Sequence, residues 1–144
     1  MAGKGAVFKN DVLKLILNAT PIANLADNAA TSPLTNLYIS LHTADPAAGD
    51  QTTSEVSYTG YARQALVRTT SGFSAASGGV ATLASNVTFP TDSGGTQGTV
   101  THIGIGTLVS GTGKLLWCGA LSPNVVLAVG PGPILASGST VTES

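Results

Sequence analysis

Charged side chains are scarce in this sequence of 144 residues, at 9% against roughly 25% in average soluble proteins. Six Lys and Arg nearly balance seven Asp and Glu, which gives a formal net charge of −1. Because DNA affinity depends largely on cations that neutralise phosphates, we expect no nucleic acid as the main partner. A surface with so little charge loses little solvation when another protein covers it, and copies repel each other weakly. This composition favours a subunit of an assembly.

Cysteine, histidine and long apolar runs are also scarce. The single cysteine, Cys118, excludes an intramolecular disulfide, and its apolar surroundings at Leu115–Leu121 predict a small, buried strand residue. His42 and Asp45 have the spacing of two metal ligands, but a catalytic zinc normally needs three. We therefore expect no metal and no other cofactor. No run approaches the roughly 20 apolar residues of a membrane span, so we also expect no membrane partner.

No catalytic motif is complete. The run Gly111–Lys114 lacks the first glycine and the final Ser or Thr of a phosphate-binding loop, so it predicts a hairpin turn. Gly104-Ile105-Gly106 lacks the third glycine of a dinucleotide site, and glycines in a strand favour a bulge or a close neighbouring backbone. The acids Asp45, Asp50 and Glu55 share one loop, which is typical of side chains that only solvate it. We expect a protein that is not an enzyme.

The sequence is rich in small residues, with 19 Thr, 14 Ser and 18 Gly. Threonine suits strands, whereas glycine and serine suit turns. From Leu37 to His42, apolar and polar residues alternate, which predicts a strand. Further predicted strands are separated by Gly, Ser and Pro turns, at 61–68, 79–84, 86–89, 99–106, 114–121, 124–129 and 139–142. About eight short strands predict an all-β fold, a jelly-roll-type β-sandwich, with one short N-terminal α-helix.

The helix is predicted over residues 10–19, because a helical stripe of apolar residues precedes Pro21. A short second helical turn is expected at 22–27. We divide the chain into an N-terminal arm, helix and connector at 1–36 and a β-sandwich at 37–144, within a single domain overall.

The N-terminal segment is the predicted partner-binding part of the chain. Three of the six cations lie in its first 14 residues. An isolated helix of this length is marginal without packing, so its stripe is expected to lie either on a neighbour or on its own sandwich. The candidate binding residues are Lys4, Phe8, Lys9, Val12, Lys14, Leu15 and Ile16.

Sheet edges predict self-association. Charged side chains hinder the pairing of a sheet edge with another chain, and Arg63 and Arg68 supply such charges to one predicted strand. The predicted strands Asn124–Val129 and Ser139–Thr142 contain neither Lys nor Arg. Pairing of such edges across a two-fold axis would give a homodimer.

Aromatic residues leave a sugar-binding alternative open. Jelly rolls include lectins, and Tyr58-Thr59-Gly60-Tyr61 offers two rings in a loop. The favoured interpretation is that these tyrosines pack the loop onto the sheet. Trp117 lies in the most apolar strand and is expected in the core.

Two segments carry a resemblance. Residues 37–46 read LYISLHTADP and residues 49–63 read GDQTTSEVSYTGYAR. Together with Val87–Pro90 and the Gly111–Lys114 turn, they resemble a family of small tailed-bacteriophage virion proteins over most of residues 37–121. Members of this family are called tail-fibre-like, and small jelly-roll proteins of this size serve as capsid cement in some phages.

The resemblance implies a non-enzymatic structural virion protein. Since the chain shows neither repeats nor a coiled-coil stalk, we predict a capsid cement, or decoration, protein that binds the assembled shell and stabilises contacts between capsid subunits. Its partners would be the major capsid protein and itself. It would be made in the bacterial host cytoplasm and lie on the capsid surface. The alternative is a tail-fibre or tail-associated structural protein, and a carbohydrate-binding jelly-roll module is a third interpretation.

Overall fold

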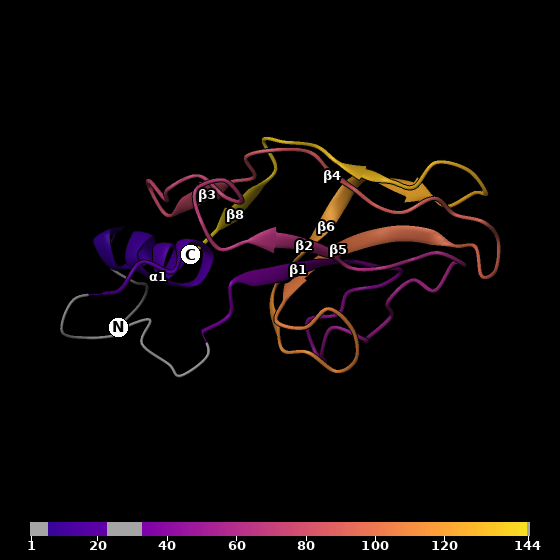
Figure 1. Ribbon diagram of the computed structural model, residues 1–144, viewed down its shortest axis with the longest axis horizontal. Coiled ribbons are helices and arrows are strands. Elements are labelled where there is room, and N and C mark those ends of the chain that lie inside the picture. The colour runs from indigo at the N-terminus through magenta and orange to yellow at the C-terminus, as the bar shows by residue number, and fades with distance from the viewer. Residues whose placement is uncertain (1–5, 23–32, 144) are drawn as a thin grey trace. The chain divides into compact units, whose positions relative to one another are not determined.

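A computed structural model describes residues 6–22 and 33–143. It contains one helix and eight strands in the order α1-β1-β2-β3-β4-β5-β6-β7-β8 (Figure 1). Their bounds are α1 Ala6–Asn18, β1 Asn36–His42, β2 Gln64–Val67, β3 Val80–Thr82, β4 Val87–Thr88, β5 Thr99–Gly106, β6 Leu115–Val126, β7 Ile134–Leu135 and β8 Thr140–Thr142. The prediction of an all-β chain with one short N-terminal helix is confirmed.

The strands form one four-stranded sheet, in the order β2-β1-β5-β6, and two two-stranded sheets, β3-β8 and β4-β7. These pairings do not confirm the predicted jelly-roll topology. β1 and β5 pair antiparallel, with Ser40 opposite Gly104 and His42 opposite His102. β6 joins two predicted strands into one, although Ser122-Pro123 reads as a turn in the sequence.

The chain forms two compact units, and each unit combines segments that lie apart in the sequence. One unit combines 1–36 with 67–86 and 135–144, and the other combines 37–66 with 87–134. Leu37 is the first residue of the second unit. Residues 67–86 and 135–144 group with the N-terminal segment, however, because β3 and β8 pair with each other and α1 packs against β3.

Each unit has its own apolar core. In the first unit, Leu13 and Leu17 of α1 are buried together with residues of β3, of β8 and of the segments on either side of β3, namely Phe73, Ala81, Leu83 and Val141. In the second, the alternation of β1 buries Leu37, Ile39 and Leu41, as predicted. Ser40 and His42 are buried as well, so both faces of β1 are covered at its C-terminal end.

Candidate interaction surfaces

The predicted partner-binding helix is longer than expected and buries a different face. Lys4 lies outside the described residues. α1 begins at Ala6 and ends at Asn18, and its buried positions are Leu13 and Leu17. The predicted residues Lys9, Val12, Lys14, Leu15 and Ile16 are half-buried, and Phe8 is exposed. The stripe misled because residues 12–17 are apolar on most sides, so spacing alone could not choose the face that packs on β3.

Polar contacts fix this helix to its own unit. Asn10 Oδ1 accepts a hydrogen bond from the Gly79 backbone N–H at 2.6 Å. Near the other end, Asn18 Nδ2 donates to the Phe73 carbonyl at 3.0 Å. The helix is therefore packed and hydrogen-bonded within its own unit. Its first turn has exposed apolar side chains, since Val7 is 75% and Phe8 is 41% exposed.

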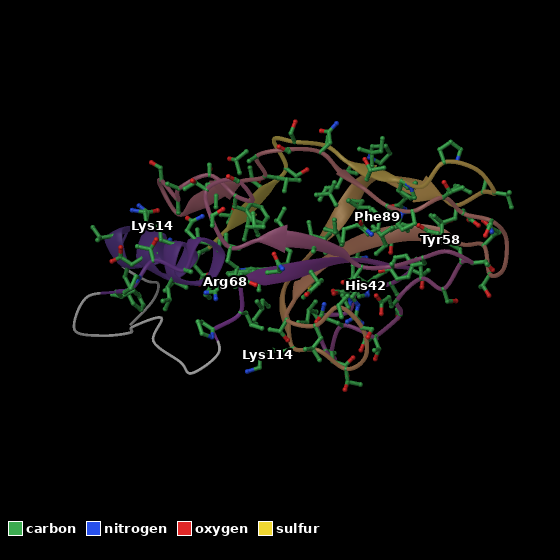
Figure 2. All side chains as sticks on the ribbon, viewed as in Figure 1. Lys14, His42, Tyr58, Arg68, Phe89 and Lys114 are labelled. Atoms are coloured by element: carbon green, nitrogen blue, oxygen red, sulfur yellow. The ribbon has the colours of Figure 1, made fainter. Side chains whose placement is uncertain are left out.

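Arg68 holds the C-terminal end of α1. Its guanidinium donates to the carbonyls of Ile16 at 2.6 Å and Leu15 at 2.7 Å, and to Leu34 at 2.6 Å. The last carbonyls of a helix lack intrahelical partners and carry partial negative charge, so a cation is well placed there. Figure 2 shows Arg68 beside the helix. Arg68, which we expected to protect a strand edge by its charge, thus caps the C-terminal end of α1.

A second arginine, Arg63, joins two loops of the other unit. Its Nε and Nη2 donate to Glu55 Oε1 and Oε2, both at 2.7 Å. Nη1 donates to the Leu108 carbonyl at 3.0 Å and Nη2 to the Gly111 carbonyl at 2.9 Å. The hydrogen bonds that Arg63 donates to the Glu55 carboxylate raise the pKa of Arg63. Glu55 is thus not a solvating acid but the anchor of this network.

A groove of about 520 Å³ lies over this network. Its lining includes Tyr58, Tyr61, Val109 and the Arg63–Glu55 pair. Tyr61 is half-buried, and its hydroxyl donates to Glu55 Oε1 at 2.8 Å and accepts from the Leu41 N–H at 3.1 Å. Its burial raises its pKa. The polar side chains that define the groove are therefore already paired within the chain.

The tyrosines pack inward, as the favoured interpretation of the sequence has it. Tyr58 is buried, and its hydroxyl donates to the Pro90 carbonyl at 2.9 Å. The rings of Tyr58 and Tyr61 meet edge to face with centroids 5.4 Å apart, and Tyr61 stacks on Phe89 at 6.3 Å. The two rings therefore pack against each other and against Phe89.

His42 belongs to a buried polar cluster rather than to solvent. Its Nδ1 donates to the Thr53 carbonyl at 2.8 Å, so in the neutral ring Nε2 accepts from the Ser40 hydroxyl, also at 2.8 Å. Burial lowers the pKa of His42. Asp45, which has the spacing of a second metal ligand in the sequence, accepts a hydrogen bond from the Ala47 N–H. Within the described residues, no three His, Cys, Asp or Glu side chains gather as a metal site would require.

The two glycine motifs serve packing. Residues 111–113 form the predicted turn, with Gly111 at a φ of 75° and the Thr107 N–H bonded to the Lys114 carbonyl at 3.1 Å. In β5 the register shifts beside Gly106, which confirms the predicted irregularity. The close neighbour of Gly106 is not a backbone, however, but the fully buried side chain of Gln51.

Cys118 and Trp117 correct the expectation of a core strand. Cys118 is exposed and Trp117 is half-buried. The strand they belong to, β6, ends the order of its sheet, and among residues 6–22 and 33–143 it pairs with a strand on one side only, so apolar composition here does not mean burial. Partial desolvation, together with Asp45 nearby, raises the pKa of the Cys118 thiol.

A comparison with models of protein families assigns the chain to one family. The model of the family described as "Podophage GP4 fiber I protein gp80" matches residues 10–142. The chain belongs to this family. A search among curated proteins gives no match.

Membership of this family identifies a structural protein of a phage virion, which agrees with the coarse resemblance seen in the sequence. The part of the chain that matches includes all of the second compact unit, most of the first, and every strand of the described residues. No described helix has the length and apolar character needed to cross a lipid bilayer.

Proposed function

We propose that this chain is a non-enzymatic structural component of the tail fibre, or of a part attached to it, in a podophage virion. The observation that carries the proposal is the family match over residues 10–142, because the family is described by a fibre protein. It favours the tail-fibre alternative over the capsid cement that we predicted first. That preference followed from the lack of repeats and of a coiled-coil stalk, and neither feature excludes a globular fibre part.

The surfaces described above support a structural role over ligand chemistry. In the groove beside Arg63, the guanidinium nitrogens Nε, Nη1 and Nη2 each donate to an acceptor within the chain. A carbohydrate-binding module would present exposed rings, whereas Tyr58 is buried. The third interpretation thus has the least support.

The copy number and position of the protein in purified virions test the proposal. On a stained gel, we expect its band to match those of tail proteins and to be far weaker than that of the major capsid protein. Antibody labelling in electron micrographs should mark the tail. A copy number near that of the major capsid protein, with label over the shell, would instead establish a cement protein and its partnership with the capsid.

We also propose that the first turn of α1 contacts a neighbouring virion protein. Val7 and Phe8 are exposed there although both are apolar. Lys9 and Lys14 outnumber the one acid, Asp11, on the same helix, so an acidic neighbour would fit best. The double change Val7→Ser and Phe8→Ser should lower incorporation into virions without lowering the melting temperature. Thr20→Ala, at an exposed site past the end of the helix, is the matched control. Unchanged incorporation of the double variant would show that this turn is dispensable.

A further inference from the structure

A hollow of about 230 Å³ lies in the second unit, where β6 ends and the chain continues toward β7. Its walls are the aliphatic residues 125–129 together with Pro131 and Pro133. One acid, Asp92, also lines the hollow, and no Lys, Arg or His does. Sites for drug-sized ligands measure roughly 300–1,000 Å³, so a hollow of this size suits a single side chain.

Asp92 is held in place by its own chain. Its N–H donates to the Gly130 carbonyl at 2.8 Å, and its carbonyl accepts from the Gly130 N–H at 2.9 Å. In the side chain, Oδ1 accepts from the Gly94 N–H at 2.8 Å and from Gln97 Nε2 at 3.1 Å. The carboxyl group is thus fixed through one of its oxygens, and its position does not depend on a ligand.

The second oxygen of Asp92 is unpartnered. The residue is 1% exposed, and Oδ2 is buried with no hydrogen bond to any described residue. No Lys, Arg or His within residues 6–22 and 33–143 forms an ion pair with Asp92. A buried carboxylate without a counter-charge lowers the stability of the free chain. Its place in the wall of a hollow therefore indicates a cation that comes from outside the chain.

The single free oxygen favours an ammonium group. A guanidinium binds best through two parallel hydrogen bonds to two oxygens, and Oδ1 is already engaged. A metal ion is less suited, because no three His, Cys, Asp or Glu side chains gather among the described residues. Aliphatic walls suit the apolar stem of a lysine. Since a charge behind such walls is weakly screened, it attracts a cation in the hollow even before the two groups touch.

The surface around the hollow favours a protein as the source of this cation. Val126 and Val129 line it and are 75% and 70% exposed, so they extend an apolar surface outward from it. Apolar area that surrounds a polar anchor is typical of the centre of a protein interface.

We propose that the hollow receives a lysine side chain of a neighbouring virion protein, with the ammonium beside Asp92 and the stem along Val126 and Val129. This inference rests on membership of a virion protein family, and it holds for a tail or a shell location alike. It concerns the second unit, whereas the contact proposed for α1 concerns the first.

Nuclear magnetic resonance of the chain labelled with nitrogen-15 tests the site, with n-butylammonium chloride as the probe. This ion has the stem and charge of a lysine side chain. We expect saturable shifts confined to residues 92–94 and 125–131, with a dissociation constant of roughly 1–50 mM. n-Butanol, which has the same stem without the charge, should bind at least about tenfold more weakly. No shifts up to about 100 mM, or equal binding of the two probes, would overturn the proposal.

Asp92→Asn separates binding from folding. Asparagine keeps an oxygen that can accept from Gly94 and Gln97, but it removes the charge. The variant should bind n-butylammonium as weakly as n-butanol. Its melting temperature should equal or exceed that of the native chain, because a buried charge without a counter-charge is gone. Native affinity for n-butylammonium, or a melting temperature several degrees lower, would contradict the proposed role of Asp92.

Incorporation into virions identifies the source of the cation. Phage that encodes Asp92→Asn should contain several-fold less of the protein per virion than native phage. Asp45→Asn is the matched control, since it makes the same change of charge at an exposed site, and it should be incorporated normally. Binding of n-butylammonium combined with normal incorporation of Asp92→Asn would show that the hollow takes a free amine, which contradicts a lysine of a virion protein. The location of the native protein by antibody labelling, which tests the proposed function, is measured separately from these outcomes.

Discussion

Arg63 and Glu55 form a two-pronged ion pair, with Nε–Oε1 and Nη2–Oε2 distances of 2.7 Å each, and the Arg63 side chain is only 2% exposed. Both residues lie in segments without regular secondary structure. The same guanidinium also binds the Leu108 and Gly111 carbonyls, so one side chain joins the loop before β2 to the turn before β6. The planar fork of arginine suits this task, and lysine could not reproduce it.

Glu55→Gln should lower the free energy of unfolding by about 3–5 kcal/mol, because it leaves the buried Arg63 cation without its counter-charge. Chemical denaturation followed by tryptophan fluorescence provides the measurement. Lys114→Gln is the control, since this side chain is exposed, and it should change stability by no more than about 0.5 kcal/mol. A cost below about 1 kcal/mol for Glu55→Gln would show that the pair is solvated in solution.

Gly106→Ala should be far more costly than Gly119→Ala, although the two glycines lie in adjacent strands. A methyl group at Gly106 would overlap the Gln51 side chain, which is fully buried and accepts from the Leu108 N–H at 2.9 Å. We expect a loss of about 1–3 kcal/mol from overpacking and about 1 kcal/mol more from the broken hydrogen bond. At Gly119 the methyl group meets nothing within 4 Å. Equal melting temperatures for the two variants would contradict this account of Gly106.

The sequence pattern was sufficient where two local signals agreed. The alternation at Leu37–His42 and the Gly and Ser turns around Thr99–Gly106 located β1 and β5 well, because apolar alternation and turn chemistry agree there. It was insufficient where burial depends on which neighbours a strand has. Cys118 seemed a core residue because its neighbours are apolar, yet β6 lies at a sheet edge, and strand order cannot be read from a pattern.

The polar network was the least predictable part. The buried partners Glu55, Arg63 and Gln51 come from loops, and nothing local in the sequence distinguishes a loop acid that anchors an arginine from one that solvates a turn. A weak signal existed. Arginine is rare in this chain, and a rare residue type flanked by aromatic and apolar residues favours a partnered position.

His42 makes stability depend on pH. Burial lowers its pKa below the ordinary value of 6.5, against the opposing effects of the Thr53 carbonyl and Glu55, while Arg63 and His102 act with burial. Just below the ordinary pKa, His42 therefore binds a proton in the unfolded chain but stays neutral in the folded chain. The stability from this difference is present above about pH 6.5 and is lost as the pH falls through the lowered pKa, with a slope of up to about 1.4 kcal/mol per pH unit. His42→Asn should remove this slope from denaturation curves measured at several pH values, whereas His102→Asn should keep it.

Ala19→Gly should stabilise the protein. Ala19 directly follows α1 and has a φ of 53°, in the left-handed region where a Cβ atom is strained. Glycine relieves that strain but loses more freedom on folding, so we expect a net gain of about 0.5–1 kcal/mol. A rise in melting temperature checks the sign. Thr20→Gly, one residue further, lacks the strained angle and should destabilise slightly, so the same response in both variants would contradict the role of the angle.

Arg68→Ala should release the C-terminal turn of α1 before the rest of its unit. The change leaves the carbonyls of Leu15 and Ile16 without the donors that now lie 2.7 and 2.6 Å away. Since a cation at a helix C-terminus contributes about 0.3–2 kcal/mol, we expect a loss near the upper end of this range, because Arg68 is half-buried and makes three contacts. Amide hydrogen exchange measures the effect where it should occur, as faster exchange in the second half of α1 with little change in β5. Lys14→Ala removes a cation from the same helix without removing a cap and should leave exchange in that turn nearly unchanged. If Arg68→Ala accelerates exchange equally in α1 and β5, the arginine stabilises the fold as a whole and does not act as a helix cap.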